Sequence, residues 1–374
     1  MTKNDKKFIK IEESVFSPKN PLIIAELGSS HNSSIIKAKN MINSAAEAGA
    51  GCIKIQMIFA DEILSPNTGE VPLPGGKTKL YDRFKILELE QEFYKEIKEY
   101  SESLGLLFLC TPFGLKSAGI LRQLQPKMVK IASPELNFTG LIEEIADWGL
   151  PVLLSSGVSR LSDIENAVEI FKNKENCSIC LLHCVTSYPA PETDYNLNVL
   201  PNLAAIFGIP VGVSDHSSDP ELVPALAVAM GAAVIEKHFC LSKTDPGLDD
   251  PIALPPEEFT KMTCAIRRAA QTVGDETIAY YSRERGEDLV QQILGSGVKE
   301  LAPSEKANYR LTNRSIHAIR DIQKGEIIQK DDYICLRTEK ILRPGLEPCW
   351  EKNIEGRTAR NFIPAGEGIR FEDI

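Results

Sequence analysis

Short apolar segments alternate with longer amphipathic segments throughout residues 20–272. Eight of the apolar segments have the length and aliphatic composition of strands buried on both faces, which is typical of parallel sheets. They span residues 22–26, 52–56, 106–110, 128–132, 151–155, 178–184, 210–214 and 233–237. Helical patterns lie between them, for example at 35–48, 91–104, 161–171 and 220–230. Eight strand–helix units in about 250 residues predict a closed (β/α)8 barrel of the TIM type rather than an open, doubly wound sheet.

Glycine recurs immediately before several of the predicted strands. The positions are Gly49, Gly105, Gly149, Gly208 and Gly231. Helices commonly end at a glycine because this residue adopts the left-handed conformation without a steric penalty. The glycines therefore support the predicted ends of the helices.

The sequence divides into three parts. A barrel domain with a short N-terminal extension is predicted for residues 1–272. Residues 273–311 are more polar and include one helical stretch at 284–294, so we interpret them as a linker. In residues 312–374, short strands at 315–318 and 334–337 alternate with turn-forming sequences such as QKGE and RPGLEP. This last part is predicted to be a small, mostly β domain.

Charge and cysteine content restrict the classes of function. The net charge is −10 and the pI is near 5.3, which argues against a nucleic acid or an anionic membrane as the partner. No stretch reaches the roughly 18 consecutive apolar residues of a membrane span. Several of the nine cysteines lie in or beside apolar strands, where a thiol behaves as a small hydrophobic side chain. We therefore expect a cytoplasmic protein with reduced thiols.

Two histidines follow the last two predicted strands. His216 ends the segment GIPVGVSDH, and His238 ends GAAVIEKH. Neighbouring strands lie about 5 Å apart, so imidazoles at the same end of adjacent strands can bind one divalent ion. A β/α barrel carries its catalytic residues at the carboxyl ends of its strands. The pair therefore predicts a metal site at the mouth of the barrel.

Two lysines and several hydroxyl groups lie on or beside strands that are otherwise apolar. Lys54 and Gln56 project to the same side of one strand, and Lys130 lies on another. Hydroxyl groups at strand ends belong to Thr111, Ser133 and Ser214. Together these groups predict a site for a phosphate or a carboxylate. The alternative is that each lysine pairs with a carboxylate in the core or extends its amine to solvent.

Two carboxylates lie close to these positions. Glu26 ends the first strand, and Glu236 shares a side of its strand with His238. A carboxylate at the rim of a barrel can act as a general acid or base, or accept a hydrogen bond from a substrate hydroxyl. Alternatively, it is structural and binds the backbone or a lysine.

The chain resembles the sialic acid synthase family in seven short motifs: AELGSSHNS, KIQ, CTPF, KIAS, LLHC followed by YPAP, GVSDHS and EKHF. They occur in order over about residues 20–260, and the C-terminal part is similar to the antifreeze-like (SAF) domain of the same family. The resemblance implies a metal-dependent condensation of phosphoenolpyruvate with an N-acetylated hexosamine. The products would be a sialic-type nonulosonic acid, for surface polysaccharide biosynthesis, and phosphate.

The resemblance also implies roles for individual residues. His216 and His238 would bind Mn2+, or alternatively Mg2+ or Co2+, and Glu26 would be the catalytic acid/base. Phosphoenolpyruvate would be bound by Lys54, Gln56, Thr111, Lys130, Ser133, Thr186 and Ser214. The amino sugar would contact Glu236, Asp249 and Arg314. Because the family's SAF domain reaches the barrel of a partner subunit, Arg314 implies a domain-swapped homodimer.

Two alternatives stay open. One is another phosphoenolpyruvate-dependent synthase, similar to the heptulosonate-phosphate synthases. The SAF-like part and the lack of a metal-binding cysteine near the histidines disfavour it. The other is a carbohydrate-binding protein with a disabled barrel, which the joint presence of the lysines, the histidines and Glu26 disfavours. Departures from the family pattern concern the choice of sugar rather than the reaction class; they are Ser30, Ser33, Gly76 and Thr186.

Overall fold

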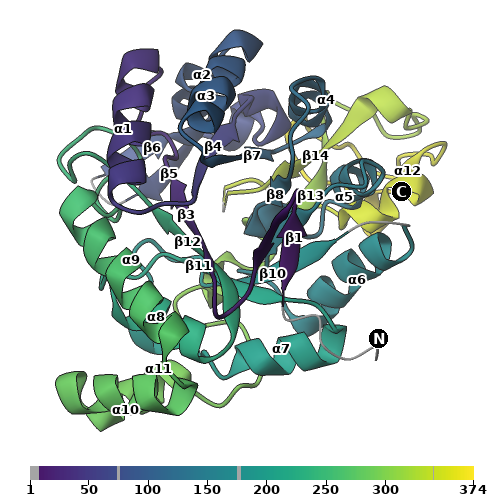
Figure 1. Ribbon diagram of the computed structural model, residues 1–374. Coiled ribbons are helices and arrows are strands. Elements are labelled where there is room, and N and C mark those ends of the chain that lie inside the picture. Colours follow the sequence, from purple (N-terminus) through teal and green to yellow (C-terminus); the bar gives the residue numbers. More distant parts are fainter. Residues whose placement is uncertain (1–7, 74–75, 175–177, 340) are drawn as a thin grey trace.

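Eight parallel strands form a nearly closed barrel at the centre of the structure, and helices surround it (Figure 1). The computed structural model describes residues 8–73, 76–174, 178–339 and 341–374. The strands follow the order β7-β4-β3-β12-β11-β10-β9-β8, and β7 and β8 at its two ends pack beside each other. The structure confirms the predicted eight-stranded barrel. Its strands are β3 (Leu22–Glu26), β4 (Cys52–Met57), β7 (Leu107–Pro112), β8 (Val129–Ile131), β9 (Val152–Ser155), β10 (Ile179–Cys184), β11 (Val211–Asp215) and β12 (Ala232–His238).

Helices between the strands cover the outer face of the barrel. They are α1 (Ile35–Glu47), α3 (Gln91–Ser103), α4 (Leu115–Gln123), α5 (Thr139–Ala146), α6 (Leu161–Lys172), α7 (Val199–Phe207), α8 (Leu222–Ala229) and α9 (Pro256–Gln271). The five glycines expected to end helices all have positive φ angles, between 67° and 101°. The expected helix ends are therefore confirmed at these positions.

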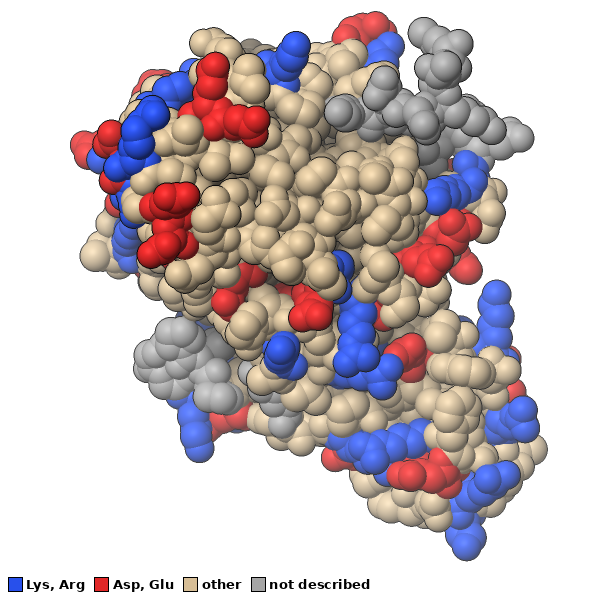
Figure 2. Space-filling model, turned by 90° about the horizontal axis from the view of Figure 1, so that it is seen from below, with Lys and Arg blue, Asp and Glu red and all other residues tan. Residues whose placement is uncertain are grey.

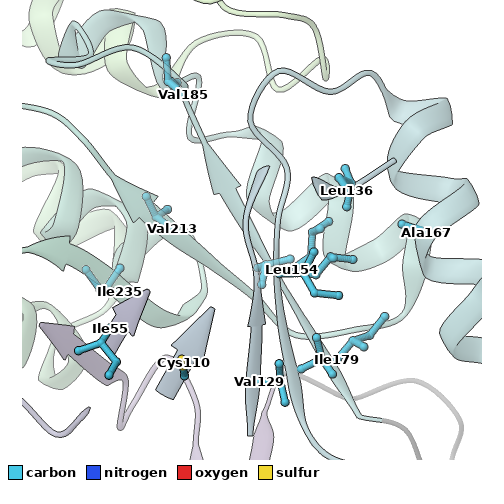
Figure 3. Packing of buried hydrophobic residues seen from close by; sticks show 14 of the residues in the cluster. Ile55, Cys110, Val129, Leu136, Leu154, Ala167, Ile179, Val185, Val213 and Ile235 are labelled. Carbon is cyan, nitrogen blue, oxygen red and sulfur yellow. The ribbon is translucent and has the colours of Figure 1, made fainter. Parts of the chain in front are cut away.

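Side chains on each strand alternate between the barrel interior and the helices, because a strand repeats every two residues. On β4, Ile53 and Ile55 belong to the layer between strands and helices, whereas Cys52 packs inside the barrel and Lys54 lines a cavity at its mouth. Figure 3 shows part of the outer layer, with contributions from Ile55, Cys110, Val129, Leu154, Val213 and Ile235. This layer holds the helices to the barrel and leaves the inward positions to form the site.

An N-terminal hairpin closes one end of the barrel. Its strands β1 (Ile9–Ile11) and β2 (Ser14–Phe16) pair antiparallel. Ile9 and Ile11 are fully buried against inward-facing side chains near the beginnings of the barrel strands. No strand is predicted here from the sequence. Each strand has only three residues, which is too few to show the alternation of apolar and polar residues that is typical of a strand. The hairpin makes this end of the barrel hydrophobic.

An insertion after β4 stands at the opposite end. It contains the hairpin β5 (Glu70–Leu73) and β6 (Gly76–Lys79), followed by α2 (Leu80–Ile86). Its apolar residues form a separate buried cluster with Phe113 from the loop after β7. The insertion therefore builds a wall at the carboxyl ends of the strands.

The remaining residues form a connection and the small C-terminal domain. The connection contains α10 (Gly274–Arg285) and α11 (Glu287–Leu294), of which only the second is predicted, because α10 is mostly polar and half exposed. The small domain contains the antiparallel pair β13 (Arg314–Ala318) and β14 (Tyr333–Arg337), followed by α12 (Glu351–Ile354). The backbone of Arg337 donates to the carbonyl of Ile63 at 2.9 Å, which joins this domain to the insertion.

Acidic and basic side chains lie interspersed on the face seen in Figure 2, around a broad area of uncharged residues. Among the coloured residues of this face, neither sign forms a continuous patch. Within the described ranges, no helix is both long and apolar enough to cross a membrane.

Ile11→Ala should lower the free energy of unfolding by about 2–5 kcal/mol, because it removes a fully buried side chain that fills the end of the barrel. Val15→Ala, at a position 46% exposed on the same hairpin, should cost less than about 1 kcal/mol. Urea denaturation of both variants measures the difference. Equal effects would contradict the hairpin's role in the core.

Candidate active site

A cavity of about 600 Å3 opens at the carboxyl ends of the barrel strands. Most of the predicted site residues line it, namely Lys54, Gln56, Lys130, Ser133, Thr186, Ser214, His216, Glu236, His238 and Asp249. Glu26 and Thr111 are buried in the barrel next to these residues without lining the cavity. Arg314 lies elsewhere. The structure thus brings together side chains that are up to 195 residues apart, from Lys54 to Asp249.

The register of the sheet explains this convergence. Glu26 is the register partner of both His238 on β12 and Lys54 on β4. On the neighbouring strand β11, Ser214 is the partner of Glu236. Inward positions nearer the beginnings of the strands are apolar. The polar side chains are therefore confined to one end of the barrel.

Two carboxylates and two lysines form a buried ionic network in the cavity. Lys54 Nζ lies 2.8 Å from Glu26 Oε2 and 3.1 Å from Glu236 Oε1. Lys130 Nζ lies 3.7 Å from Glu236 Oε1, which also accepts a hydrogen bond from Ser214 at 2.9 Å. Burial raises the pKa of Glu236, but the two ammonium groups outweigh it and lower this pKa to about 2. Each lysine therefore has a carboxylate close by and still faces the cavity.

Glu26 extends this network below the cavity. Gln56 donates a hydrogen bond to Glu26 Oε1 at 2.6 Å, and the carboxylate is 1% exposed. Thr111 on β7 is the register partner of Gln56, and its buried hydroxyl has no hydrogen-bond partner among the described residues. Glu26 thus contacts two residues that line the cavity, Gln56 and Lys54.

The two histidines lie side by side, with ring centroids 5.5 Å apart. His216 Nδ1 lies 2.9 Å from the carbonyl oxygen of Val185, and a proton on this nitrogen leaves Nε2 with a free lone pair. Burial lowers the pKa of His238 to about 3, so its ring is neutral at pH 7. Its Nδ1 lies 3.8 Å from Asp249. Across the described part of the chain, no group of three or more His, Cys, Asp and Glu is arranged to hold a metal ion.

Two residues beside the histidines are not predicted from the sequence. The ring of Tyr188 stacks on His216 at a centroid distance of 4.2 Å and meets His238 edge-on at 6.2 Å. Cys184 Sγ lies 3.8 Å from His216 Nδ1. Because β10 and β11 are neighbours, Cys184 lies near His216 although it precedes it by 32 residues. Among the described residues it forms no metal-binding group with the two histidines. The YPAP motif after LLHC is the signal that could have indicated Tyr188.

Hydroxyl groups from the segments after β8 and β10 meet at Gly157, in the loop after β9. A Cβ atom at this glycine would lie 2.2 Å from Thr186 Oγ1 and 2.9 Å from Ser133 Oγ, so no side chain fits. The hydroxyls of Ser155 and Thr186 are buried and have no hydrogen-bond partner within the described ranges. Buried polar groups normally have partners, so these hydroxyls are available to a ligand. Ser155 is missed by sequence reasoning because a lone serine in an apolar strand carries no signal.

The loop after β12 brings Asp249 to the cavity. Ser30, in the loop after β3, donates a hydrogen bond to the carboxylate of Asp250. Asp250 also accepts the backbone N–H of Gly247 at 2.7 Å. Ser30, one of the departures from the family pattern, therefore anchors the loop that carries Asp249.

Arg314 lies at the junction between the barrel and the small domain, outside the cavity of its own chain. Its guanidinium is fully buried and lies 2.9 Å from Glu135 in the barrel part of the same chain. It also donates to the carbonyl oxygens of Glu62 and Phe113. A buried carboxylate such as Glu135 needs a cationic partner, and this need holds Arg314 at the junction between barrel and small domain. Arg314 therefore does not reach the cavity of its own chain.

Arg337 is the residue of the small domain that lines the cavity. It ends β14, and its Nη2 lies 2.7 Å from Glu135. Glu135 thus pairs with two arginines, one internal and one at the cavity. Arg314 and Arg337 are register partners in the pair of β13 and β14, so they lie next to each other. The sequence alone does not indicate which of the two side chains faces the cavity.

One wall of the cavity is apolar. It consists of side chains from the insertion after β4 and from the loop after β7, namely Ile58, Ile63, Leu80, Phe84, Leu87 and Phe113. The sequence feature that could have indicated this wall is the connection from residue 58 to residue 90, which is much longer than an ordinary βα loop.

Lys54→Met should lower the free energy of unfolding by about 3–5 kcal/mol, because Glu26 and Glu236 would stay buried with one ammonium group fewer. The double variant Lys54→Met/Glu236→Gln should recover part of this loss, since it removes one of the two carboxylate charges. Lys85→Met is the control, because its ion pair with Asp61 is exposed and screened by solvent. Urea denaturation of the variants provides the comparison, and strictly additive losses would argue against the network.

The chain matches known families along most of its length. Residues 41–278 match the NeuB family, and residues 313–374 match the SAF domain. The chain is 34% identical to N,N'-diacetyllegionaminic acid synthase of Legionella pneumophila, over 94% of each chain. It is 32% identical to pseudaminic acid synthase of Campylobacter jejuni, over 95% of this chain and 97% of the relative. The crystal structure of the spore coat polysaccharide biosynthesis protein SpsE from Bacillus subtilis is similar with a TM-score of 0.81 and 31% identity, covering 98% of this chain and 99% of that chain. The chain therefore belongs to the NeuB family and carries a C-terminal SAF domain.

Proposed function

We propose that this protein catalyses a metal-dependent condensation of phosphoenolpyruvate with an N-acetylated hexosamine, either N-acetylmannosamine or a modified form. The products are a nonulosonic acid, used for surface polysaccharide biosynthesis, and phosphate. One observation carries the proposal: a single cavity combines two lysines and unpaired hydroxyls with a pair of histidines. The synthases among the relatives make legionaminic and pseudaminic acids, which supports a product of this class.

Phosphoenolpyruvate would bind at the lysines and hydroxyls. Lys54 and Lys130 supply positive charge for its carboxylate and phosphate. Ser133 and Thr186 supply hydroxyl donors next to Gly157, and Ser155 on β9 also lines the cavity. Holding both ends of this small anion orients its C3 carbon toward the acceptor, which is a large source of rate acceleration.

The donor atoms at the histidines fit a divalent cation, which we propose to be Mn2+, with Mg2+ or Co2+ as alternatives. Imidazole nitrogens suit this class of ion, and the Val185 carbonyl fixes the ring of His216 as a second-sphere partner should. His216 and His238 would hold the ion. When bound, it would polarise the aldehyde of the acceptor sugar as a Lewis acid.

The reaction needs one new C–C bond and one broken C–O bond. C3 of phosphoenolpyruvate attacks the sugar aldehyde, whose oxygen takes up a proton. Water then adds at C2, and phosphate leaves by C–O cleavage. We propose that Glu26 handles the proton at the sugar carbonyl or at the water through Lys54, which pairs with its carboxylate and lines the cavity, while Gln56 holds the carboxylate in place. Glu236 lines the cavity itself, so it is placed to contact the sugar.

The walls of the cavity support an acylated amino sugar. The apolar side chains of the insertion offer contacts for an acetyl methyl group, and Asp249 and Arg337 offer polar contacts. Arg337 is therefore a further candidate sugar contact, from the SAF domain of the same chain, and the role of Arg314 stays tied to the predicted domain-swapped dimer.

The alternatives are weaker. Cys184 lies near His216 but forms no metal-binding group with the two histidines among the described residues. The full-length similarity to nonulosonic acid synthases also favours the sialic-type reaction over a heptulosonate-phosphate synthase. A disabled, carbohydrate-binding barrel is disfavoured because the network, the hydroxyls and the histidines all converge on the cavity.

The domain-swapped homodimer and the cytoplasmic location stay predictions. Swapping exchanges contacts within one chain for the same contacts between two chains, so the pair Arg314–Glu135 would form in either arrangement. The cysteines that the structure describes are free thiols, which supports a reducing compartment.

Phosphate release from phosphoenolpyruvate should depend on an N-acetylated hexosamine and on Mn2+. The measurement uses a panel of N-acetylmannosamine, its 6-phosphate, a 2,4-diacetamido-2,4,6-trideoxyhexose and erythrose 4-phosphate. Reactions without sugar or with a chelator are the controls. Turnover with erythrose 4-phosphate alone would support the heptulosonate-type reaction instead.

His216→Ala and His238→Ala should each abolish metal-dependent turnover while the barrel stays folded. Each variant loses one imidazole donor, so Mn2+ affinity measured by calorimetry should fall about 10-fold or more. Circular dichroism reports on the fold. Unchanged activity and unchanged Mn2+ affinity would contradict the metal assignment.

A further inference from the structure

We propose that Glu305, in the connection between the barrel and the SAF domain, is a positioning residue that holds Thr186 and the loop after β9 in the phosphoenolpyruvate site. Residues 299–313 of this connection are called the clamp segment here. The inference rests on the proposed function, because it assigns a task to the anion-binding hydroxyls.

Glu305 is a buried carboxylate that binds backbone amides from three places. Its Oε2 accepts the N–H of Val158 at 2.9 Å and the N–H of Thr186 at 2.8 Å, and its Oε1 accepts the N–H of Ala302 at 3.2 Å. The side chain is 1% exposed. Hydrogen bonds to a charged acceptor in a dry environment are strong. One side chain of the clamp segment thus joins the loops after β9 and β10.

Thr186 is held by the clamp segment on both sides of its backbone. Glu305 accepts its N–H, and the side-chain amide of Asn308 donates to its carbonyl oxygen at 3.2 Å. Thr186 lines the cavity, and its buried hydroxyl has no hydrogen-bond partner within the part of the chain that the structure describes. Fixing the backbone on both sides therefore fixes the position of Thr186 in the cavity wall.

Val158 shows that the clamp also imposes an unfavourable backbone conformation. Its φ angle is +42°, in a region that β-branched residues almost never adopt. Glu305 binds its N–H, and Asn313 donates to its carbonyl oxygen at 3.2 Å. Such conformations persist only where surrounding contacts over-determine them, and they gather at functional sites. The clamp segment supplies those contacts.

The consequence of this conformation is seen at the preceding residue, Gly157. Its N–H donates to Ser133 Oγ at 2.9 Å, and it lies so close to Thr186 Oγ1 that a Cβ atom would not fit. The strained turn thus packs the backbone of the β9 loop against two of the hydroxyls assigned to phosphoenolpyruvate. Lys299, also in the clamp segment, adds a third attachment by donating to the carbonyl of Ser156 at 3.2 Å. The clamp segment therefore sets the shape of the anion site without touching the anion.

Glu305→Ala should raise the KM and the dissociation constant for phosphoenolpyruvate about 10-fold, because two loops lose their common acceptor. The KM for the sugar should change less than about 2-fold, since the sugar wall is built from other segments. Glu305→Gln should show a smaller effect, because its carbonyl oxygen can still accept the N–H groups of Thr186 and Val158. Steady-state kinetics and calorimetric titration with phosphoenolpyruvate, on the full chain with Mn2+, measure these changes.

Glu300→Ala is the matched control, because Glu300 is an exposed glutamate of the same segment and should leave both constants unchanged. If Glu305→Ala does not fold, Asn308→Ala and Glu305→Gln take its place, with expected increases of about 3-fold in the phosphoenolpyruvate constants. A lower melting temperature with unchanged constants, or an equal rise for both substrates, would overturn the positioning role.

The outcome separates this inference from the proposed function. Wild-type protein that binds phosphoenolpyruvate but turns over no sugar of the panel would reject the reaction, and the titrations would still decide the role of Glu305. Wild-type protein that binds no phosphoenolpyruvate would overturn both.

Discussion

The cavity depends on the buried ion pairs of Lys54 with Glu26 and Glu236. Charges can be buried in a barrel only when they are paired, and the register of β3, β4 and β12 provides this pairing by placing Glu26 between Lys54 and His238. The opposite end of the barrel is filled by Ile9 and Ile11, so it needs no charges. This division into an apolar end and a charged end confines the chemistry to the carboxyl ends of the strands.

Buried carboxylates recur as attachment points around this charged end. Glu135 joins the SAF domain to the barrel through Arg314 and Arg337, and Glu305 joins the clamp segment to the loops after β9 and β10. Asp250 does the same for the loop that carries Asp249. In each case a carboxylate satisfies groups from segments far apart in sequence. These loops are therefore held by polar contacts, whereas the insertion after β4 and the barrel beneath are held by hydrophobic packing.

Much of the barrel and of the polar site could be predicted, because both follow from local regularities. Strands buried on both faces appear as apolar runs, and Lys54 and Glu236 stand out as charges within such runs. Other features had no local signal. The hairpin of Ile9 and Ile11 is too short to show a period, and Cys184 looks like any small core residue until β10 and β11 lie side by side. The pairing of Arg314 with the buried Glu135 also had no local signal, because the two residues are far apart in the sequence.

The sequence by itself determined the (β/α)8 architecture, the SAF-type C-terminal part and the set of polar residues at the strand ends, because periodicity and short motifs are local properties. Only the tertiary structure decided which of these residues share one cavity, that Arg337 rather than Arg314 lines it, and that Glu305 binds Thr186. Such contacts join residues more than 100 positions apart, as Thr186 and Glu305 are. The register of the sheet and the need to pair buried charges select the partners in these contacts. Neither the register nor the pairing can be read from any single segment of the chain.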